Sequence, residues 1–70
     1  MPENEALSFN IKQIRKEMNQ SQMEFAAECG ISMETLSLIE RQLTDPKLST
    51  IQKIAAYADK DVPELLRKRK

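Results

Sequence analysis

The 70-residue sequence contains no histidine, only one cysteine and only one glycine. Without histidine, the chain lacks the side chain that most often serves as a general base or metal ligand. A single cysteine excludes an intrachain disulfide and suits a reducing compartment. Cys29 and scattered carboxylates do not form a metal site, and no nucleophile–base pair can be assembled from the remaining residues. We therefore expect no enzymatic activity, no cofactor and no metal ion, and we interpret Cys29 as a small buried apolar residue.

Long apolar segments are also missing from the sequence. No apolar run approaches the ~20 residues that a membrane-spanning helix needs, and no charged-then-apolar leader opens the chain. We therefore expect a cytoplasmic protein without membrane contact. A chain of this length forms one domain and buries only about 60% of its unfolded surface, so the core should be small.

The charges balance, but they are unevenly distributed. Eleven basic residues face eleven acidic ones, and four of the basic residues form the segment 67–70 at the end. The rest of the chain then carries seven basic and eleven acidic residues. Because neutralised phosphates and released counterions drive nucleic-acid affinity, this composition argues against such a partner unless the basic residues lie in the right places.

The apolar pattern predicts an all-α chain of five helices, since no strand-like alternation occurs. Leu7, Ile11, Ile14 and Met18 fall on one face of an amphipathic helix over about 8–18. Residues 1–6 lack this period and are predicted to form a flexible N-terminal arm. Later in the chain, the pairs Ser49/Gln52 and Asp61/Glu64 have the spacing of capping boxes that open a fourth and a fifth helix.

The segment 21–40 predicts two short helices joined by a tight turn. Ser21 with Glu24 forms a capping box, and Gly30 supplies the left-handed residue that ends the first helix. Ala26, four residues earlier, faces the partner helix and must be small. Ser32 then caps a second helix over about 33–41. This is the pattern of a helix-turn-helix, whose second helix can lie in the DNA major groove.

The same residues resemble a known family. The sequence is similar to lambda-repressor-like, Cro-type (XRE) helix-turn-helix domains at Gln22, Ala26, Gly30, Ile31, Leu36, Ile39 and Glu40. Outside the motif, the similarity includes Arg15, Pro46, Leu48, Ile51, Ile54, Ala55 and Leu65. The resemblance implies a compact five-helix domain over 7–66, followed by a basic tail over 67–70.

The resemblance also implies roles for particular side chains. Arg15 and Glu40 are expected to form a structural ion pair that fixes the angle of the recognition helix; the alternative is two separate surface charges. The DNA phosphates are expected to contact Ser21, Gln22, Thr35, Arg41 and Lys47. For Ser21 the alternative is capping alone, and for Gln22 it is a solvated side chain.

The outward face of the recognition helix is expected to read bases through Met33, Glu34, Ser37 and Leu38. Glu34 can accept a hydrogen bond from cytosine N4, and the two apolar side chains can contact thymine methyl groups. Amides and arginines, the usual bidentate donors, are scarce here. This apolar and acidic face is therefore also compatible with a protein contact.

The ends of the third and fourth helices depart from the family pattern. Gln42 and Asp59 stand where glycine commonly ends the third and fourth helices, and glutamine tolerates a left-handed conformation less well than aspartate does. Strain is therefore expected near Gln42, in the loop that carries the phosphate contacts.

Together these features predict a sequence-specific regulator that binds double-stranded DNA, most simply a repressor acting by operator occupancy. One helix reads few base pairs, so a homodimer on an inverted repeat is expected. Val62, Leu65 and Leu66 are candidates either for that interface or for the core. No small-molecule ligand is predicted. The alternative function is a protein-binding helix-turn-helix module of the antitoxin or anti-regulator type.

Overall fold

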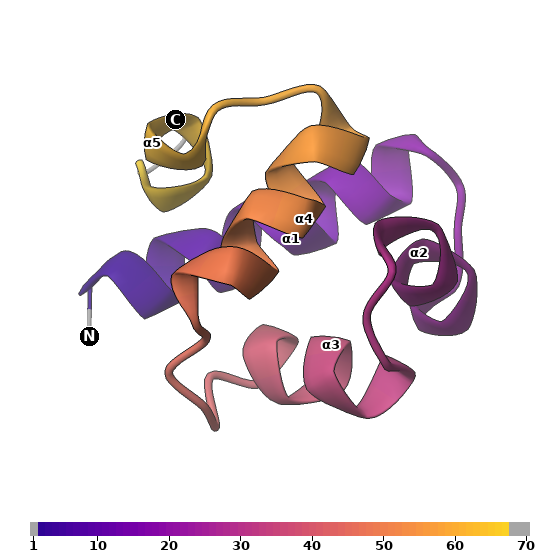
Figure 1. Cartoon of the computed structure of the whole chain (residues 1–70), viewed down its shortest axis with the longest axis horizontal. Coiled ribbons are helices and arrows are strands. Elements are labelled where there is room, and N and C mark those ends of the chain that lie inside the picture. Colours follow the sequence, from indigo (N-terminus) through magenta and orange to yellow (C-terminus); the bar gives the residue numbers. More distant parts are fainter. Residues whose placement is uncertain (1, 68–70) are drawn as a thin grey trace.

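The computed structural model of the protein describes residues 2–67 and is all-helical over this range. Its helices are α1 (Pro2–Glu17), α2 (Gln22–Cys29), α3 (Met33–Glu40), α4 (Leu48–Ala58) and α5 (Val62–Leu66) (Figure 1). The prediction of a five-helix, all-α domain is therefore confirmed. Residues 68–70 of the predicted basic tail lie outside the described part of the chain.

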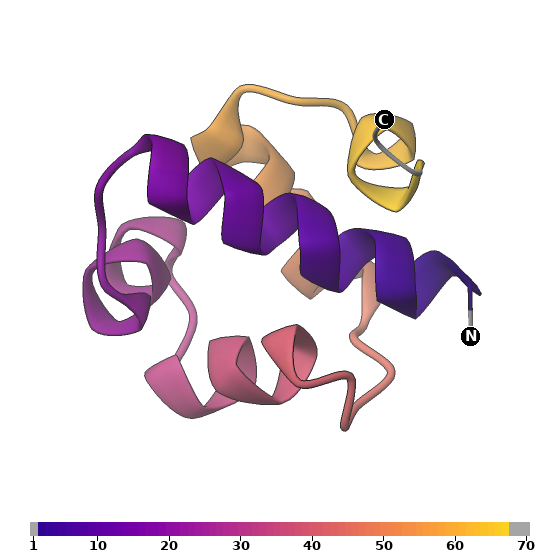
Figure 2. The same cartoon turned by 180° about the vertical axis from the view of Figure 1, so that it is seen from behind.

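The helices surround one apolar core. Helix α1 packs against α3 and α5, α2 packs against α3 and α4, and α4 packs against α5. Figure 2 shows α1 crossing the back of the molecule, whereas α4 lies at the front in Figure 1. All five helices contribute to the core. The largest fully buried apolar side chains are Leu7, Ile11, Phe25, Leu36, Ile54 and Leu65. Helix α3 forms the lower edge in Figure 1, with no other helix beneath it.

The predicted N-terminal arm is wrong, because α1 already begins at Pro2. Proline is favourable at the first helical position, where its missing N–H has no intrahelical partner to lose. Ala6 is buried, and Asn4 Nδ2 donates a hydrogen bond of 3.0 Å to Asp45 Oδ1 in the α3–α4 loop. This first part of α1 escaped detection because one buried alanine gives no apolar period.

The start of α4 also differs from the prediction. The helix begins at Leu48 after Lys47, so Ser49 is already inside it and the predicted Ser49/Gln52 capping box does not exist. Pro46 and the extended backbone of Lys47 (φ −68°, ψ 151°) set the boundary instead. At α5 a capping box is present, and the Glu64 carboxylate accepts the Asp61 N–H at 2.9 Å.

The first four helices end in the same way, with a left-handed residue and a pair of backbone hydrogen bonds. The left-handed residues are Asn19, Gly30, Gln42 and Asp59, with φ between 57° and 80°. After α2, for example, the N–H of Ile31 bonds to Ala26 O at 3.0 Å and that of Gly30 to Ala27 O at 3.2 Å. This pairing defines a Schellman motif. Only one of the four positions is glycine, so the other three residues hold a conformation that disfavours side chains.

Helix α3 is fixed to α1 at its C-terminal end. Arg15 pairs with Glu40 through two hydrogen bonds, Nε to Oε2 at 2.9 Å and Nη2 to Oε1 at 3.0 Å. Ser8, two turns earlier on α1, donates its hydroxyl to the backbone carbonyl of Glu40 at 2.6 Å. Because the last carbonyls of a helix have no intrahelical partner, this bond satisfies one that is otherwise orphaned. The angle between α1 and α3 is thereby set by polar contacts as well as by packing.

The left-handed residues at the helix ends generate a prediction in which the free energy of unfolding changes in opposite directions at two positions. Gly30→Ala should destabilise the domain by about 1 kcal/mol, because the added methyl group meets no neighbour within 4 Å and only the φ of +80° opposes it. Gln42→Gly should stabilise it by about 0.5–1 kcal/mol by relieving the same strain, less the entropy that glycine adds to the unfolded chain. Urea unfolding followed by circular dichroism measures both changes. A Gly30→Ala variant with the same free energy of unfolding as the wild type would contradict the assignment of strain.

The ion pair generates a second prediction. Glu40 is only 3% exposed and the Arg15 side chain 19%, so Arg15→Met should cost about 3 kcal/mol by leaving a buried carboxylate unpaired. The double variant Arg15→Met/Glu40→Met should lose clearly less than the sum of the single variants. Lys16→Met, at an exposed neighbouring position, is the control. A coupling energy below about 0.5 kcal/mol in urea titrations would reduce the pair to an ordinary surface contact.

Candidate nucleic-acid interface

Helix α3 separates cleanly into an inward and an outward face. Leu36, Ile39 and Glu40 are buried. The side chains predicted to read bases are exposed at Met33 and Glu34 and half-buried at Ser37 and Leu38. These four positions are spaced i, i+4 in two adjacent rows, so they form one continuous surface. With Met33 51% exposed, this surface combines apolar, acidic and hydroxyl groups.

The N-terminus of α2 is closed by its own capping box. Ser21 Oγ accepts the N–H of Glu24 at 3.1 Å, and Glu24 Oε1 accepts the N–H of Ser21 at 2.8 Å. Hydrogen bonding to its carboxylate, chiefly from the Ser21 backbone N–H and then from the Ser21 side chain, lowers the pKa of Glu24. A carboxylate therefore already lies where the free N–H groups and dipole of a helix would attract a phosphate. Ser21 is exposed beside it.

Gln22 has a partner that the sequence did not indicate. Its Nε2 donates a hydrogen bond of 2.9 Å to Glu40 Oε1. The predicted role as a free phosphate donor therefore applies at most to the second N–H of this amide, because the first is engaged inside the motif. Gln22 is half-buried, in contrast to the solvated side chain of the alternative interpretation.

Thr35 belongs to the cap of α3. The Ser32 hydroxyl accepts the Thr35 N–H at 3.0 Å and donates to Thr35 Oγ1 at 2.7 Å. Thr35 is half-buried, and in the contact with Ser32 its Oγ1 accepts, so that its own hydroxyl proton is not used there. A phosphate contact through this hydroxyl is compatible with the cap.

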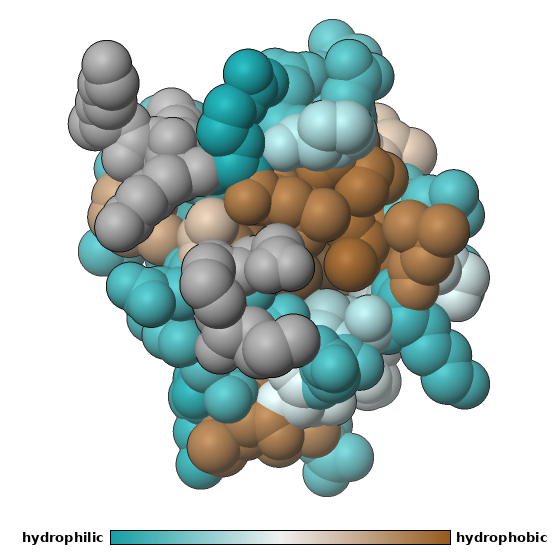
Figure 3. All heavy atoms as spheres, turned by 90° about the vertical axis from the view of Figure 1, so that its left-hand side faces the viewer, coloured by the Kyte–Doolittle hydropathy of each residue, from teal (hydrophilic) through white to brown (hydrophobic). Residues whose placement is uncertain are grey.

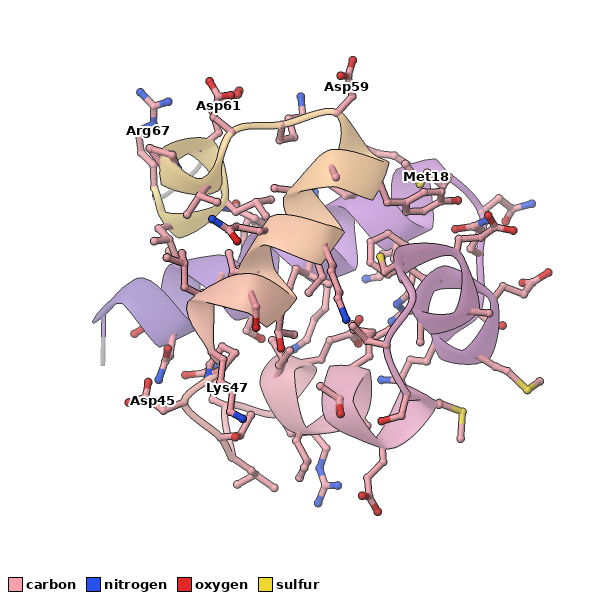
Figure 4. All side chains as sticks on the ribbon, in the orientation of Figure 1. Met18, Asp45, Lys47, Asp59, Asp61 and Arg67 are labelled. Atoms are coloured by element: carbon pink, nitrogen blue, oxygen red, sulfur yellow. The ribbon has the colours of Figure 1, made fainter. Side chains whose placement is uncertain are left out.

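The loop after α3 holds the two predicted basic contacts. Arg41 caps the C-terminal end of α3 and is exposed, and Lys47 is exposed at the start of α4. Figure 4 shows Lys47 and Asp45 in this loop, on the side of the molecule that also carries α3. Leu43, which the sequence did not single out, is 60% exposed between them. The loop therefore presents two cations and one apolar side chain next to the outward face of α3.

Charge within the motif and this loop is predominantly negative. Residues 21–47 contain only two basic side chains, Arg41 and Lys47, against five acidic ones, which are Glu24, Glu28, Glu34, Glu40 and Asp45. Glu40 is neutralised by Arg15, and Asp45 is bonded to Asn4. Any anionic partner must therefore bind through a few well-placed donors rather than through a strongly basic field.

Three further side chains, those of Tyr57, Arg15 and Asn10, hold together segments of the fold that surround the motif. Tyr57 donates its hydroxyl to Gln20 Oε1 at 3.0 Å, while Arg15 Nη1 bonds Gln20 O at 3.2 Å, so α4 and α1 both hold the segment before α2. Asn10, which is 1% exposed, donates to Leu65 O and Arg67 O at 2.7 Å each. One signal for Asn10 is visible in the sequence, because it interrupts the apolar stripe of α1 between Leu7 and Ile14.

The described residues offer few other groups that could react or bind a metal ion. Burial, followed by the charge of Glu28, raises the pKa of Cys29 to about 11, which matches its interpretation as an apolar core residue. Among residues 2–67, no three His, Cys, Asp or Glu side chains lie close enough together to hold a metal ion. No helix in that range is long and apolar enough to cross a membrane.

Comparison with known proteins agrees with this geometry. The profile of the Helix-turn-helix family matches residues 11–65. A solved structure described as a hypothetical transcription factor, NHTF, from Neisseria superposes with a TM-score of 0.87 at 31% identity, over 93% of this chain and 75% of that one.

Curated relatives give a second similarity. Antitoxin HigA1 from Mycobacterium tuberculosis, in strains CDC 1551 / Oshkosh and ATCC 25618 / H37Rv, is 41% identical over 46 residues. The match covers 66% of this chain but only 31% of each relative, so the chain spans about a third of their length. Because the family profile covers most of the chain and the fold agrees over nearly all of it, this protein belongs to the XRE-type helix-turn-helix family.

Proposed function

We propose that this protein is a transcriptional regulator that binds double-stranded DNA in a sequence-specific manner and represses by occupying an operator. The observation that carries the proposal is the division of α3, whose buried residues fix it to the core, while no other helix lies below it in Figure 1. Family membership and the transcription-factor neighbour support the same function.

In this docking mode α3 lies in the major groove. Met33 and Leu38 contact thymine methyl groups, and Glu34 accepts from cytosine N4. The two ends of the motif contact the flanking backbone. Ser21 and Gln22 are proposed for one phosphate. Thr35, Arg41 and Lys47 are proposed for the others, and these phosphate contacts set orientation while the base contacts set sequence.

The proposed operator-bound form is a homodimer. Leu65 is 1% exposed and belongs to the core, so it is no longer an interface candidate. Val62 and Leu66 are only partly buried on α5, and Leu48 on α4 is 60% exposed. Figure 3 shows an apolar area on the side of the molecule where α4 begins and α5 lies. A second copy would cover this area and place two recognition helices about one DNA turn, ~34 Å, apart.

One set of observations favours a second function, a protein-binding module. The motif carries more acidic than basic side chains, and Met23 and Met33 are 65% and 51% exposed. Methionine suits adaptable apolar contacts. The 41% identical relatives are antitoxins by name. For this function the outward face of α3 would contact a protein rather than base edges.

Selection of bound duplexes from a random pool tests the two functions against each other. DNA binding predicts an enriched, two-fold-symmetric site and an affinity that falls with salt, reflecting about 4–6 phosphate contacts per monomer. Arg41→Glu should lower the affinity for the selected duplex at least ~100-fold at low salt. Met33→Ala should mainly change sequence preference at one position. Failure to enrich any site, at both low and moderate salt, would leave the protein-binding function.

The capping carboxylate gives a further prediction. Glu24→Gln should tighten binding of the selected duplex about twofold at low salt, because it removes a negative charge at the end of α2 where the phosphate is proposed to bind. Glutamine preserves the capping box. The gain should vanish near 1 M salt, where the Debye length is ~3 Å. Asp59→Asn is the matched control, since Asp59 lies at the opposite end of the molecule from α3 (Figure 4). Equal gains in both variants would show a general charge effect instead.

A further inference from the structure

Glu40 has more partners than an ion pair requires. Its Oε2 accepts from Arg15 Nε at 2.9 Å, and its Oε1 accepts from both Arg15 Nη2 at 3.0 Å and Gln22 Nε2 at 2.9 Å. The residue is 3% exposed. One buried carboxylate on α3 therefore contacts the first residue of α2 as well as α1.

We propose that Glu40 is a positioning residue that holds the Gln22 amide, so that its second N–H is ready to donate to a DNA phosphate. This inference rests on the DNA-binding function proposed above and adds to it a role for a side chain that does not itself touch DNA. A carboxylate can only accept hydrogen bonds. The NH₂ group of Gln22, and not its carbonyl, must therefore face Glu40.

The hydrogen bond from Gln22 to Glu40 lowers the entropy cost of DNA binding. A free glutamine side chain loses rotamer freedom when it is immobilised at an interface, and this loss opposes association. Gln22 is already held before DNA arrives. Its amide is also protected from the flipped orientation, in which the carbonyl oxygen would face the carboxylate. The second N–H of Gln22 is therefore carried by a nitrogen whose position at the start of α2 is fixed.

Arg15 makes this arrangement compatible with a phosphate. A bare carboxylate one side chain away from the DNA backbone would repel it, and the two-point contact with Arg15 cancels that charge. The network Arg15–Glu40–Gln22 thus lets an anion orient a donor toward another anion. Glu24, at the same end of α2, lacks a comparable cation among its bonds, which end at Ser21.

The experiment is a coupling measurement with the duplex recovered by selection. Fluorescence anisotropy at fixed salt compares Gln22→Met in the wild-type background and in Glu40→Gln. We expect Gln22→Met to weaken binding about tenfold in the wild type and less than about twofold in Glu40→Gln. A single methylphosphonate at the contacted position should weaken the wild type but not Gln22→Met. Tyr57→Phe, which loses one hydrogen bond in the adjacent segment, is the control and should keep the methylphosphonate sensitivity.

A second measurement on the free protein does not depend on the folding of Glu40→Gln. The side-chain amide of Gln22 should have a high NMR order parameter, above about 0.6, whereas that of exposed Gln52 should be mobile. A mobile Gln22 amide overturns the inference, and so does a Gln22→Met effect that is absent or equal in both backgrounds. In those cases salt-dependent binding of the wild type preserves the proposed function. If the wild type binds no duplex, the proposed function fails and the inference fails with it.

Discussion

The buried carboxylate of Glu40 is the contact on which the motif geometry depends. Packing alone would let α3 rotate or slide on an apolar surface, since dispersion contacts are weakly directional. Glu40 removes this freedom by joining Arg15 on α1 with Gln22 on α2, while Ser8 holds the same residue by its backbone carbonyl. A charge that is this deeply buried is costly unless every lone pair has a partner. The hydrogen bonds of Glu40 with Arg15, Gln22 and Ser8 therefore set the orientation of the outward face of α3.

The sequence was most informative where local rules and packing agree. The turn at Gly30 and the inward residues of α3 follow from steric preference and helical spacing, so they could be predicted. Positions without such a rule were missed. Among residues 4–6, in the part of α1 that was missed, only Ala6 is buried. The start of α4 is set by Pro46 and Lys47 rather than by the serine that has the spacing of a cap. Both errors concern helix boundaries, where several weak preferences compete.

The candidate site could be predicted in its residues but not in its connections. The resemblance pointed to Arg15 and Glu40, because a cation and an anion at those positions pair in the family. It did not indicate the bond from Gln22 to the same carboxylate, which depends on how α2 and α3 approach each other in space. Asn10 and Tyr57 brace distant segments through contacts that are 55 and 37 residues apart in sequence. Contacts of this kind leave no local pattern.

The division of α3 has an evolutionary consequence. Three of its eight residues, Leu36, Ile39 and Glu40, supply the attachment to the core, and the cap at Ser32 and the left-handed stop at Gln42 lie outside the helix. The exposed positions Met33 and Glu34 can therefore vary with little effect on folding, and the half-buried Ser37 and Leu38 are less constrained than the buried residues. Related domains can therefore acquire a different target, even a protein in place of a DNA duplex, through substitution of a few outward side chains while the fold is retained.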